Sequence, residues 1–421
     1  MSAASDLETG VERVPERRRR RVTLPVVLLG IAVLLLLLAV IRVITGADDI
    51  ASSGTLGAAV ALAVPIGMAG LGGLWAERAG IVNIGLEGMM ILGTWGAGFG
   101  GYHWGPWAGV GLGIVAGAVG GLLHALATVT FGVDHIVSGV AINILGLGAA
   151  QYLAAVAFVG KPGGGSTQSP PIQDLPELSV PGLRGTLGDL EQKNWFFLSD
   201  LAAALRAVTV GVSALTVIAV ALVIATYFVL WRTAFGLRLR SCGENPLAAE
   251  SLGVNVYKYK YYAVIVSGAL AGLGGAFLAI VAASAYRDGQ TGGRGFIGLA
   301  AMIFGNWRPG GLAAGAGLFG YTDALQLRRG GESVHALLLV VAVALAAVAV
   351  YQVVKGRRVQ AGVSAFFAIA FLVWFLSTDE VPGAFTGLTP YITTLLVLAL
   401  AAQRLRMPAA DGMVYRRGQG V

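Results

Sequence analysis

The sequence predicts an all-α protein that crosses a membrane many times, and three observations support this fold class. Hydrophobic residues make up 56% of the 421 positions and charged residues only 12%, whereas soluble domains carry about 25% charged residues. The apolar residues form long runs, and about 20 such residues suffice for one transmembrane helix. Basic residues collect at the ends of these runs, as in polytopic membrane proteins.

The apolar runs predict about 10–12 transmembrane helices. Region 295–327 fits either one broken helix or two short ones around 306–309. Two crossings keep Arg308 and the basic segment 355–358 on the cytosolic side, so we favour two. The twelve candidate spans are 22–45, 55–74, 84–102, 106–131, 135–159, 201–231, 261–283, 295–306, 309–327, 334–354, 359–378 and 389–404.

The N-terminal residues 1–21 form a polar tail that ends in five consecutive arginines, 17–21. The apolar run that follows is long, and no cleavage site with small residues comes after it. These features favour an uncleaved first helix with a cytosolic N-terminus over a signal peptide.

Two long polar loops interrupt the predicted transmembrane core, 22–327. Loop 160–200 is rich in Gly, Pro, Ser and acidic residues and falls outside the cell when spans are counted. Loop 232–260 has basic residues at both ends and is expected in the cytosol. Beyond the core, 328–388 adds a pair of spans, and 389–421 holds the last helix and a basic cytosolic tail.

Glycines spaced four residues apart mark one helix face in the span 106–131. These are Gly109, Gly113, Gly117 and Gly121. Small residues in this pattern allow close packing between membrane helices, so we expect a packing stripe without chemistry.

Polar side chains inside apolar segments have two readings. In the structural one, Glu77 and Arg78 form an ion pair that fixes the entry of the third span, and Asn83 caps a helix. In the functional one, polar groups line a path for a polar solute, because ionisable groups at membrane depth face the bundle interior or water. If 83–94 is helical, Asn83, Glu87 and Thr94 share one face. The other intramembrane candidates are Asn143, Gln151, Asp323 and Gln326.

No motif for catalysis or metal binding has the right context. The glycines 315, 317 and 320 match a dinucleotide fingerprint, but they lie in an apolar span with no preceding strand. Lys161 is at the wrong end of its glycine-rich stretch for a phosphate loop. The four histidines lack metal-ligand spacing, and the single cysteine, Cys242, excludes an intramolecular disulfide. We therefore expect no catalytic residues, no metal and no cofactor on this chain, and no nucleic acid partner.

The loop 232–260 contains the signals of a short capped helix. Asn245 is a suitable N-cap, Pro246 fits the first helical position and Gly253 can end the helix. A helix this short is marginal alone and needs a surface to pack against. It can be a docking element or an ordered connector, and the residues alone favour neither.

The same loop carries a resemblance to a known family. Its pattern G-E-N-P-x-A-A-x-x-x-G-V-N-V, from Gly243, resembles the coupling-helix loop of bacterial ABC importer permeases of the branched-chain amino acid, simple sugar and nucleoside group. Segment 71–93, LGGLWAERAGIVNIGLEGMMILG, resembles the nucleoside branch of that group. Segments 133–143, 295–307 and 390–418 are also similar, whereas 328–385 departs from the pattern.

The resemblance implies the membrane-spanning permease subunit of an ATP-driven importer, with nucleosides as the first choice of substrate. It implies that ATP and magnesium bind to separate ATPase subunits, and that a second related permease and an extracellular solute-binding protein complete the importer. It also implies the bacterial inner membrane, with lipid around the chain and both termini in the cytosol. The residues implied in ATPase coupling are Gly243, Glu244, Asn245, Pro246, Ala248, Ala249 and Gly253.

Two alternatives remain open from the sequence. A sugar or branched-chain amino acid permease would share the same architecture. An ion-driven secondary transporter would use Glu77, Glu87 and Asp323 as proton or cation sites, but it has no use for a capped docking helix.

Overall fold

The computed structural model of the chain describes residues 24–327, 330–387, 389, 392 and 405–418. The predicted tail 1–21 and most of the predicted last span, 389–404, lie outside the described residues. The described part is helical, with one small sheet of two strands, β1 (Glu177–Leu178) and β2 (Val212–Ser213). The strands pair antiparallel, with Glu177 opposite Ser213.

The helices follow one another along the chain with short connections. Helices α4 and α11 each continue into a π-helical turn, 126–130 and 278–282, and a 3-10 turn, Asp48–Ala51, precedes α2. The helices are α1 (Leu24–Thr45), α2 (Ser53–Arg78), α3 (Leu86–Trp104), α4 (Pro106–Ala125), α5 (His135–Phe158), α6 (Leu183–Gln192), α7 (Leu198–Thr209), α8 (Ala214–Arg232), α9 (Ala234–Glu244), α10 (Pro246–Ser251), α11 (Val256–Phe277), α12 (Arg294–Phe304), α13 (Pro309–Leu327), α14 (Gly330–Val354), α15 (Arg358–Ser377) and α16 (Gly383–Thr386).

Among the described residues, seven helices are long and apolar enough to cross a membrane: α2, α4, α5, α8, α11, α14 and α15. The predicted fold class, a polytopic helical membrane protein, is confirmed. Other predicted spans coincide with α1, α3, α12 and α13. Helix α12 has only 11 residues, which is too short to cross a bilayer unaided.

The predicted span 201–231 is wrong, because two helices occupy it. Helix α7 ends at Thr209, and Gly211 follows with φ +67°. The chain then passes through β2, and the Ser213 side chain caps α8 by accepting a hydrogen bond from the Leu215 N–H. The apolar composition of α7 hides this break.

The ambiguous region 295–327 forms two helices, α12 and α13, joined by a turn. Asn306 and Trp307 in this turn have φ of +54° and +52°. Non-glycine residues seldom adopt this left-handed region, and two in succession stop α12 sharply before Pro309 opens α13. Two helices therefore occupy this region, as the sequence favoured, and two crossings of the membrane stay a prediction.

Helices α2 and α11 form the centre of the bundle, and α3, α4, α12 and α13 pack around them. A Cβ atom added to Gly117 of α4 would lie 2.6 Å from the Cα atom of Gly272 on α11. The two backbones therefore touch, and the predicted glycine packing stripe is confirmed.

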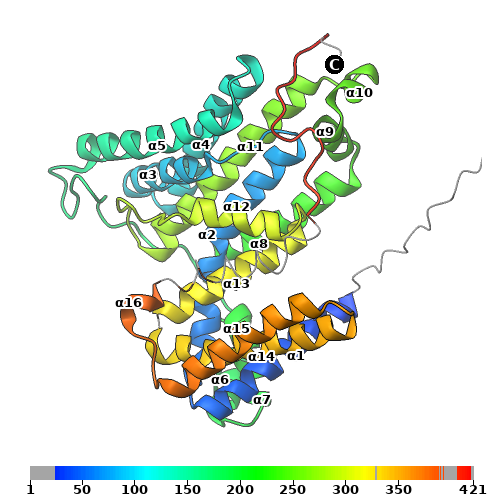
Figure 1. Cartoon of the computed structure of the whole chain (residues 1–421). Coiled ribbons are helices and arrows are strands. Elements are labelled where there is room, and N and C mark those ends of the chain that lie inside the picture. The colour runs from blue at the N-terminus through cyan, green and yellow to red at the C-terminus, as the bar shows by residue number, and fades with distance from the viewer. Residues whose placement is uncertain (1–23, 328–329, 388, 390–391, 393–404, 419–421) are drawn as a thin grey trace, which may run out of the picture.

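Helices α1, α14 and α15 form a layer beside this core (Figure 1). Leu38 and Ile41 of α1 are buried in one cluster with Leu325 of α13 and Ala336 of α14. The opposite ends of α2 face different elements. At the start of α2, the Ser53 N–H donates to Glu191 of α6. At the end of α2, the Arg78 guanidinium lies 3.8 Å from the Glu244 carboxylate of α9.

Candidate functional site

Glu77 and Arg78, the last residues of α2, hold the turn between α12 and α13. The Glu77 carboxylate accepts a 2.5 Å hydrogen bond from Nε1 of Trp307. Arg78 donates to the Trp307 backbone carbonyl at 2.7 Å and lies 3.8 Å from a carboxylate oxygen of Glu244. The structure thus differs from the predicted Glu77–Arg78 ion pair, because each side chain binds a group other than its neighbour.

Asn83 ties the turn before α3 to α11. Its side chain is 0% exposed. Its Nδ2 donates to Oγ of Ser267 at 2.8 Å, and its Oδ1 accepts from the Gly85 N–H at 3.1 Å. The N-cap of α3 is Gly85, so Asn83 precedes the cap position that the structural reading gave it. Its polar atoms are already bonded within the bundle.

Glu87, in the first turn of α3, sits at the N-terminus of α12. Its carboxylate accepts hydrogen bonds from the N–H of Gly293 at 2.9 Å and of Gly295 at 2.7 Å. A carboxylate is stabilising there, because the first amides of a helix lack partners and the helix dipole is positive at that end. Glu87 therefore acts as a cap supplied by a neighbouring helix.

Other predicted path residues also make contacts within the bundle. The side chain of Asn143 joins α5 to α3 by accepting from the Gly88 N–H at 2.8 Å and donating to the Ile84 carbonyl at 2.9 Å. Thr94 donates to a carbonyl of its own helix. Asp323 forms a 2.7 Å ion pair with Arg294, which joins α13 to α12. These contacts position helices and leave few groups for a solute.

Gln151 is the exposed member of the predicted set. It lies on α5, and its Nε2 donates to Oδ2 of Asp288 at 2.9 Å. Asp288 belongs to segment 283–293, which connects α11 and its π-turn to α12. The neighbouring Tyr152 has 69% of its surface exposed. An amide and a carboxylate thus meet on the accessible face of α5 that carries Gln151, and an exposed aromatic residue follows next in the sequence.

Several buried polar atoms close to this face lack hydrogen-bond partners. Among the described residues they include Nε1 of Trp95, the hydroxyl of Tyr286 and Nε2 of Gln290. Trp95 packs in the buried cluster of Phe158 and Tyr286. Buried polar groups are nearly always paired, so these donors are exceptions for which the described residues supply no acceptor. Asp288, Tyr286 and Gln290 were not among the predicted site residues. The polar stretch ahead of 295–306 is the signal in the sequence that indicates them.

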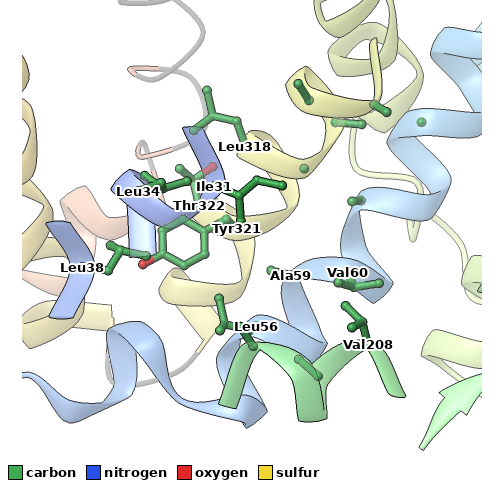
Figure 2. Close-up of a pocket in the computed structure, with 18 of the residues that line it drawn as sticks. Ile31, Leu34, Leu38, Leu56, Ala59, Val60, Val208, Leu318, Tyr321 and Thr322 are labelled. Atoms are coloured by element: carbon green, nitrogen blue, oxygen red, sulfur yellow. The ribbon is translucent and has the colours of Figure 1, made fainter. Parts of the chain in front are cut away.

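A large crevice of about 860 Å³ lies between α1, α2, α7, α8, α13 and α14 (Figure 2). Its wall is aliphatic, with side chains such as Leu34, Leu56 and Val60. The Tyr321 hydroxyl at its edge already donates to the Ile50 carbonyl. Sites for polar ligands need a few convergent polar groups. This crevice therefore suits an apolar ligand rather than a polar solute.

The second candidate site is the loop that contains α9 and α10. The Asn245 side chain accepts from the Ala248 N–H at 2.9 Å, Pro246 opens α10 and Gly253 has φ +80°. The predicted capped helix is therefore confirmed. Ala249 is 2% exposed, whereas Leu252, which follows α10, is 85% exposed.

The predicted coupling residues therefore divide into two groups. Gly243 and Ala249 are buried, and a Cβ atom on Gly243 would collide with the Arg78 backbone. Glu244, Asn245, Ala248 and Gly253 are exposed, with Pro246 half-buried. The outward face of this loop thus includes Asn245, Ala248 and Leu252.

The family described as the branched-chain amino acid transport system permease component matches residues 55–348. This chain belongs to that family. The guanosine ABC transporter permease protein NupQ of Bacillus subtilis is 32% identical over 370 residues, covering 86% of this chain and 96% of NupQ. The nucleoside ABC transporter permease protein NupC of Lactococcus lactis is 31% identical, covering 83% of this chain and 93% of NupC.

A third relative is the guanosine ABC transporter permease protein NupP of Bacillus subtilis, 25% identical over 61% of this chain and 69% of NupP. No solved structure matches the chain. The 370-residue likeness to NupQ is longer than the 55–348 family match. NupQ therefore shares part of the chain outside that core.

Proposed function

We propose that this permease subunit imports nucleosides as part of an ATP-driven transporter. The observation that carries the proposal is the likeness to NupQ and NupC along nearly their whole lengths. The names of both relatives specify nucleoside transport. The amide of Gln151, the half-buried carboxylate of Asp288 and the exposed ring of Tyr152 suit the hydroxyls and base of such a solute.

The ATP-dependent step belongs to a separate ATPase subunit, which binds ATP and magnesium and docks on α10. The capped helix supports this assignment, because Asn245, Ala248 and Leu252 are exposed at α10 and are free to contact a docked subunit. On this reading α10 and the chain termini are cytosolic, segment 160–200 is extracellular, and the membrane is the bacterial inner membrane.

The solute passes along the face formed by α5 and segment 283–293. A half-length helix whose N-terminus starts inside the bundle is common at the sites of membrane transporters, and α12 has this form. Gln151 and Asp288 bond the sugar hydroxyls, while Tyr152 stacks on the base; stacking on an aromatic side chain contributes about 1–3 kcal/mol per base.

A second permease closes the path from the other side. Helix α5 exposes a row of large apolar residues, including Ile136, Val140 and Ile144, which a related subunit can cover. NupQ and NupP of one organism both match this chain, which supports a heterodimer. An extracellular solute-binding protein delivers the nucleoside. The pair of helices in 328–388 packs on α1 and α13, in the layer away from α5.

The test is uptake of labelled guanosine, uridine, ribose, glucose and leucine by cells that express the chain with its partner subunits. Leu252→Arg places a charge on the outward face at α10. Leu178→Arg is the matched control, because Leu178 is also exposed but lies in β1. We expect nucleoside uptake that Leu252→Arg reduces at least tenfold, with membrane levels unchanged, and that Leu178→Arg leaves intact.

Two results would overturn the proposal. Uptake that survives Leu252→Arg and collapses with a protonophore would show a transporter driven by an ion gradient. Uptake of glucose, ribose or leucine in place of nucleosides would retain the ATP-driven mechanism and replace the substrate.

A further inference from the structure

The C-terminal segment 405–418, called here the C-terminal strap, runs without regular secondary structure along α9 and α10 and turns at 409–412 (Figure 1, red). Within it, Pro408, Ala410 and Asp411 are buried. The Ala410 N–H donates to the Gly243 carbonyl at 2.8 Å. A segment with no helix of its own is thus held by contacts to other elements.

The strap contacts α10 through hydrogen bonds to Glu250. The hydroxyl of Tyr415 donates to Oε2 of Glu250 at 2.6 Å, and Nε of Arg417 donates to Oε1 at 3.1 Å. The Tyr415 ring also packs on the buried cluster of Cys242, Ala249 and Val256. The side chain of Arg417 is 79% exposed, and exposed ion pairs contribute little, so Tyr415 is the stronger contact.

The other half of the strap contacts the membrane bundle. The Arg406 N–H donates to Oδ1 of Asn306 at 2.8 Å, in the turn between α12 and α13. Just after the end of α2, the strap packs against Gly80 and Val82: a Cβ atom built on Gly80 would lie 3.1 Å from the Ala410 carbonyl oxygen, and one built on Gly412 would lie 3.5 Å from the Val82 side chain. The strap therefore joins α10 to the α12–α13 turn and to α2, which are the elements that Glu77 and Trp307 already hold together.

We infer that the C-terminal strap is a brace that makes α10 move together with α2 and the α12–α13 turn, with Tyr415 as its main positioning residue on α10. The inference rests on the proposed function. Helix α10 has six residues and cannot hold its own orientation. Without the brace, a force that the docked ATPase applies to α10 tilts this helix about the two loops that flank it. The force is then not passed on to α12.

The first test measures nucleoside uptake and ATP hydrolysis by the complete transporter in proteoliposomes. Tyr415→Ala removes the ring and the hydroxyl, Tyr415→Phe keeps the ring, and Met413→Ala changes an exposed strap residue as the control. Coupling between sites commonly amounts to a factor of about 5–150. We expect Tyr415→Ala to lower uptake per ATP hydrolysed at least fivefold, Tyr415→Phe to recover most of it and Met413→Ala to have no effect.

A second test does not depend on how well the Tyr415 variants fold. Glu250→Cys and Arg417→Cys are combined and joined by a short bismaleimide, which replaces the native ion pair by a covalent link. The inference expects uptake per ATP to be kept or improved after linking. Loss of uptake on linking would show that the strap must leave α10 during transport, which overturns the brace.

The two proposals fail in different ways. If Leu252→Arg abolishes uptake but Tyr415→Ala leaves uptake per ATP unchanged, the strap is not a brace and the ATP-driven function stands. If Leu252→Arg has no effect on uptake, docking through α10 is wrong and the brace falls with it.

Discussion

The carboxylate of Glu87 on α3 accepts a 2.7 Å hydrogen bond from the backbone N–H of Gly295 on α12. The same carboxylate also accepts from Gly293. Helix α12 begins inside the bundle, where water cannot satisfy its first amides. One side chain from a helix more than 200 positions away in the sequence therefore makes this short helix possible.

Replacing Glu87 should destabilise the protein in proportion to the acceptors lost. Glu87→Ala leaves two amides unsatisfied, and each buried unsatisfied group costs about 1–3 kcal/mol. Glu87→Gln keeps one acceptor and should lose less. Thermal unfolding in detergent measures both changes, with Asp189→Asn as a control because Asp189 is exposed. Equal melting temperatures for wild type and Glu87→Ala would contradict the capping role.

Gly117 should tolerate no side chain, whereas Gly111 on the same helix should. A Cβ atom on Gly117 meets the α11 backbone, while one on Gly111 meets nothing within 4 Å. Overpacking a core commonly costs about 1–3 kcal/mol, and a rigid backbone gives way less than a side chain. We expect Gly117→Val to reduce the yield of folded, monodisperse protein strongly and Gly111→Val to match wild type. Similar yields for the two variants would refute the close α4–α11 contact.

The parts of the structure that the sequence predicts well depend on neighbouring residues. Asn245, Pro246 and Gly253 specify α10 because capping acts within one turn. The glycine stripe on α4 follows from a spacing of four. The fold class follows from composition, since a bilayer demands long apolar helices.

The partners of the polar residues could not be predicted, because those partners lie far away in the chain. Glu77 and Arg78 are adjacent, yet both bind Trp307, about 230 positions later. The same holds for Gln151 and Asp288. The break between α7 and α8 was missed for another reason: its apolar flanks satisfy the composition criterion for one span, and only Gly211 and Ser213 mark it.

Cys242 should be inert in the folded protein. Its side chain is fully buried, its Sγ contacts the Arg238 carbonyl, and burial raises the pKa of the thiol to about 11. Maleimides react with the thiolate, so wild type should stay unlabelled until it is denatured. The thiol of Leu252→Cys is exposed and should react readily. Because Cys242 stays unlabelled, it need not be replaced in this experiment.

The same variant tests the orientation of α10. A membrane-impermeant maleimide should label Leu252→Cys in inverted vesicles and leave it unlabelled in intact cells. Labelling of intact cells would place α10 outside and contradict docking of a cytosolic ATPase.

Attachment of the C-terminal strap should weaken as the pH rises from about 4 towards neutrality. Burial raises the pKa of Asp411 from 3.8 to about 7, and Glu77 and Arg78 of α2 and Lys260 of α11 face the same carboxyl. A carboxyl with a raised pKa binds its proton more tightly in the attached state. The stabilisation of the attached strap by protonated Asp411 is complete below the ordinary pKa of about 3.8. It is lost as the pH rises through the raised pKa of about 7.

Hydrogen exchange of the strap amides, corrected for intrinsic rates, measures this attachment. We expect protection of 405–418 to fall between about pH 4 and pH 7 in the wild type and to change little at higher pH. Asp411→Asn carries no ionisable proton, so its protection should stay nearly constant over the same interval. If the two proteins lose protection equally, ionisation of Asp411 does not control the strap, and the pH dependence arises from the remaining groups at the end of α2.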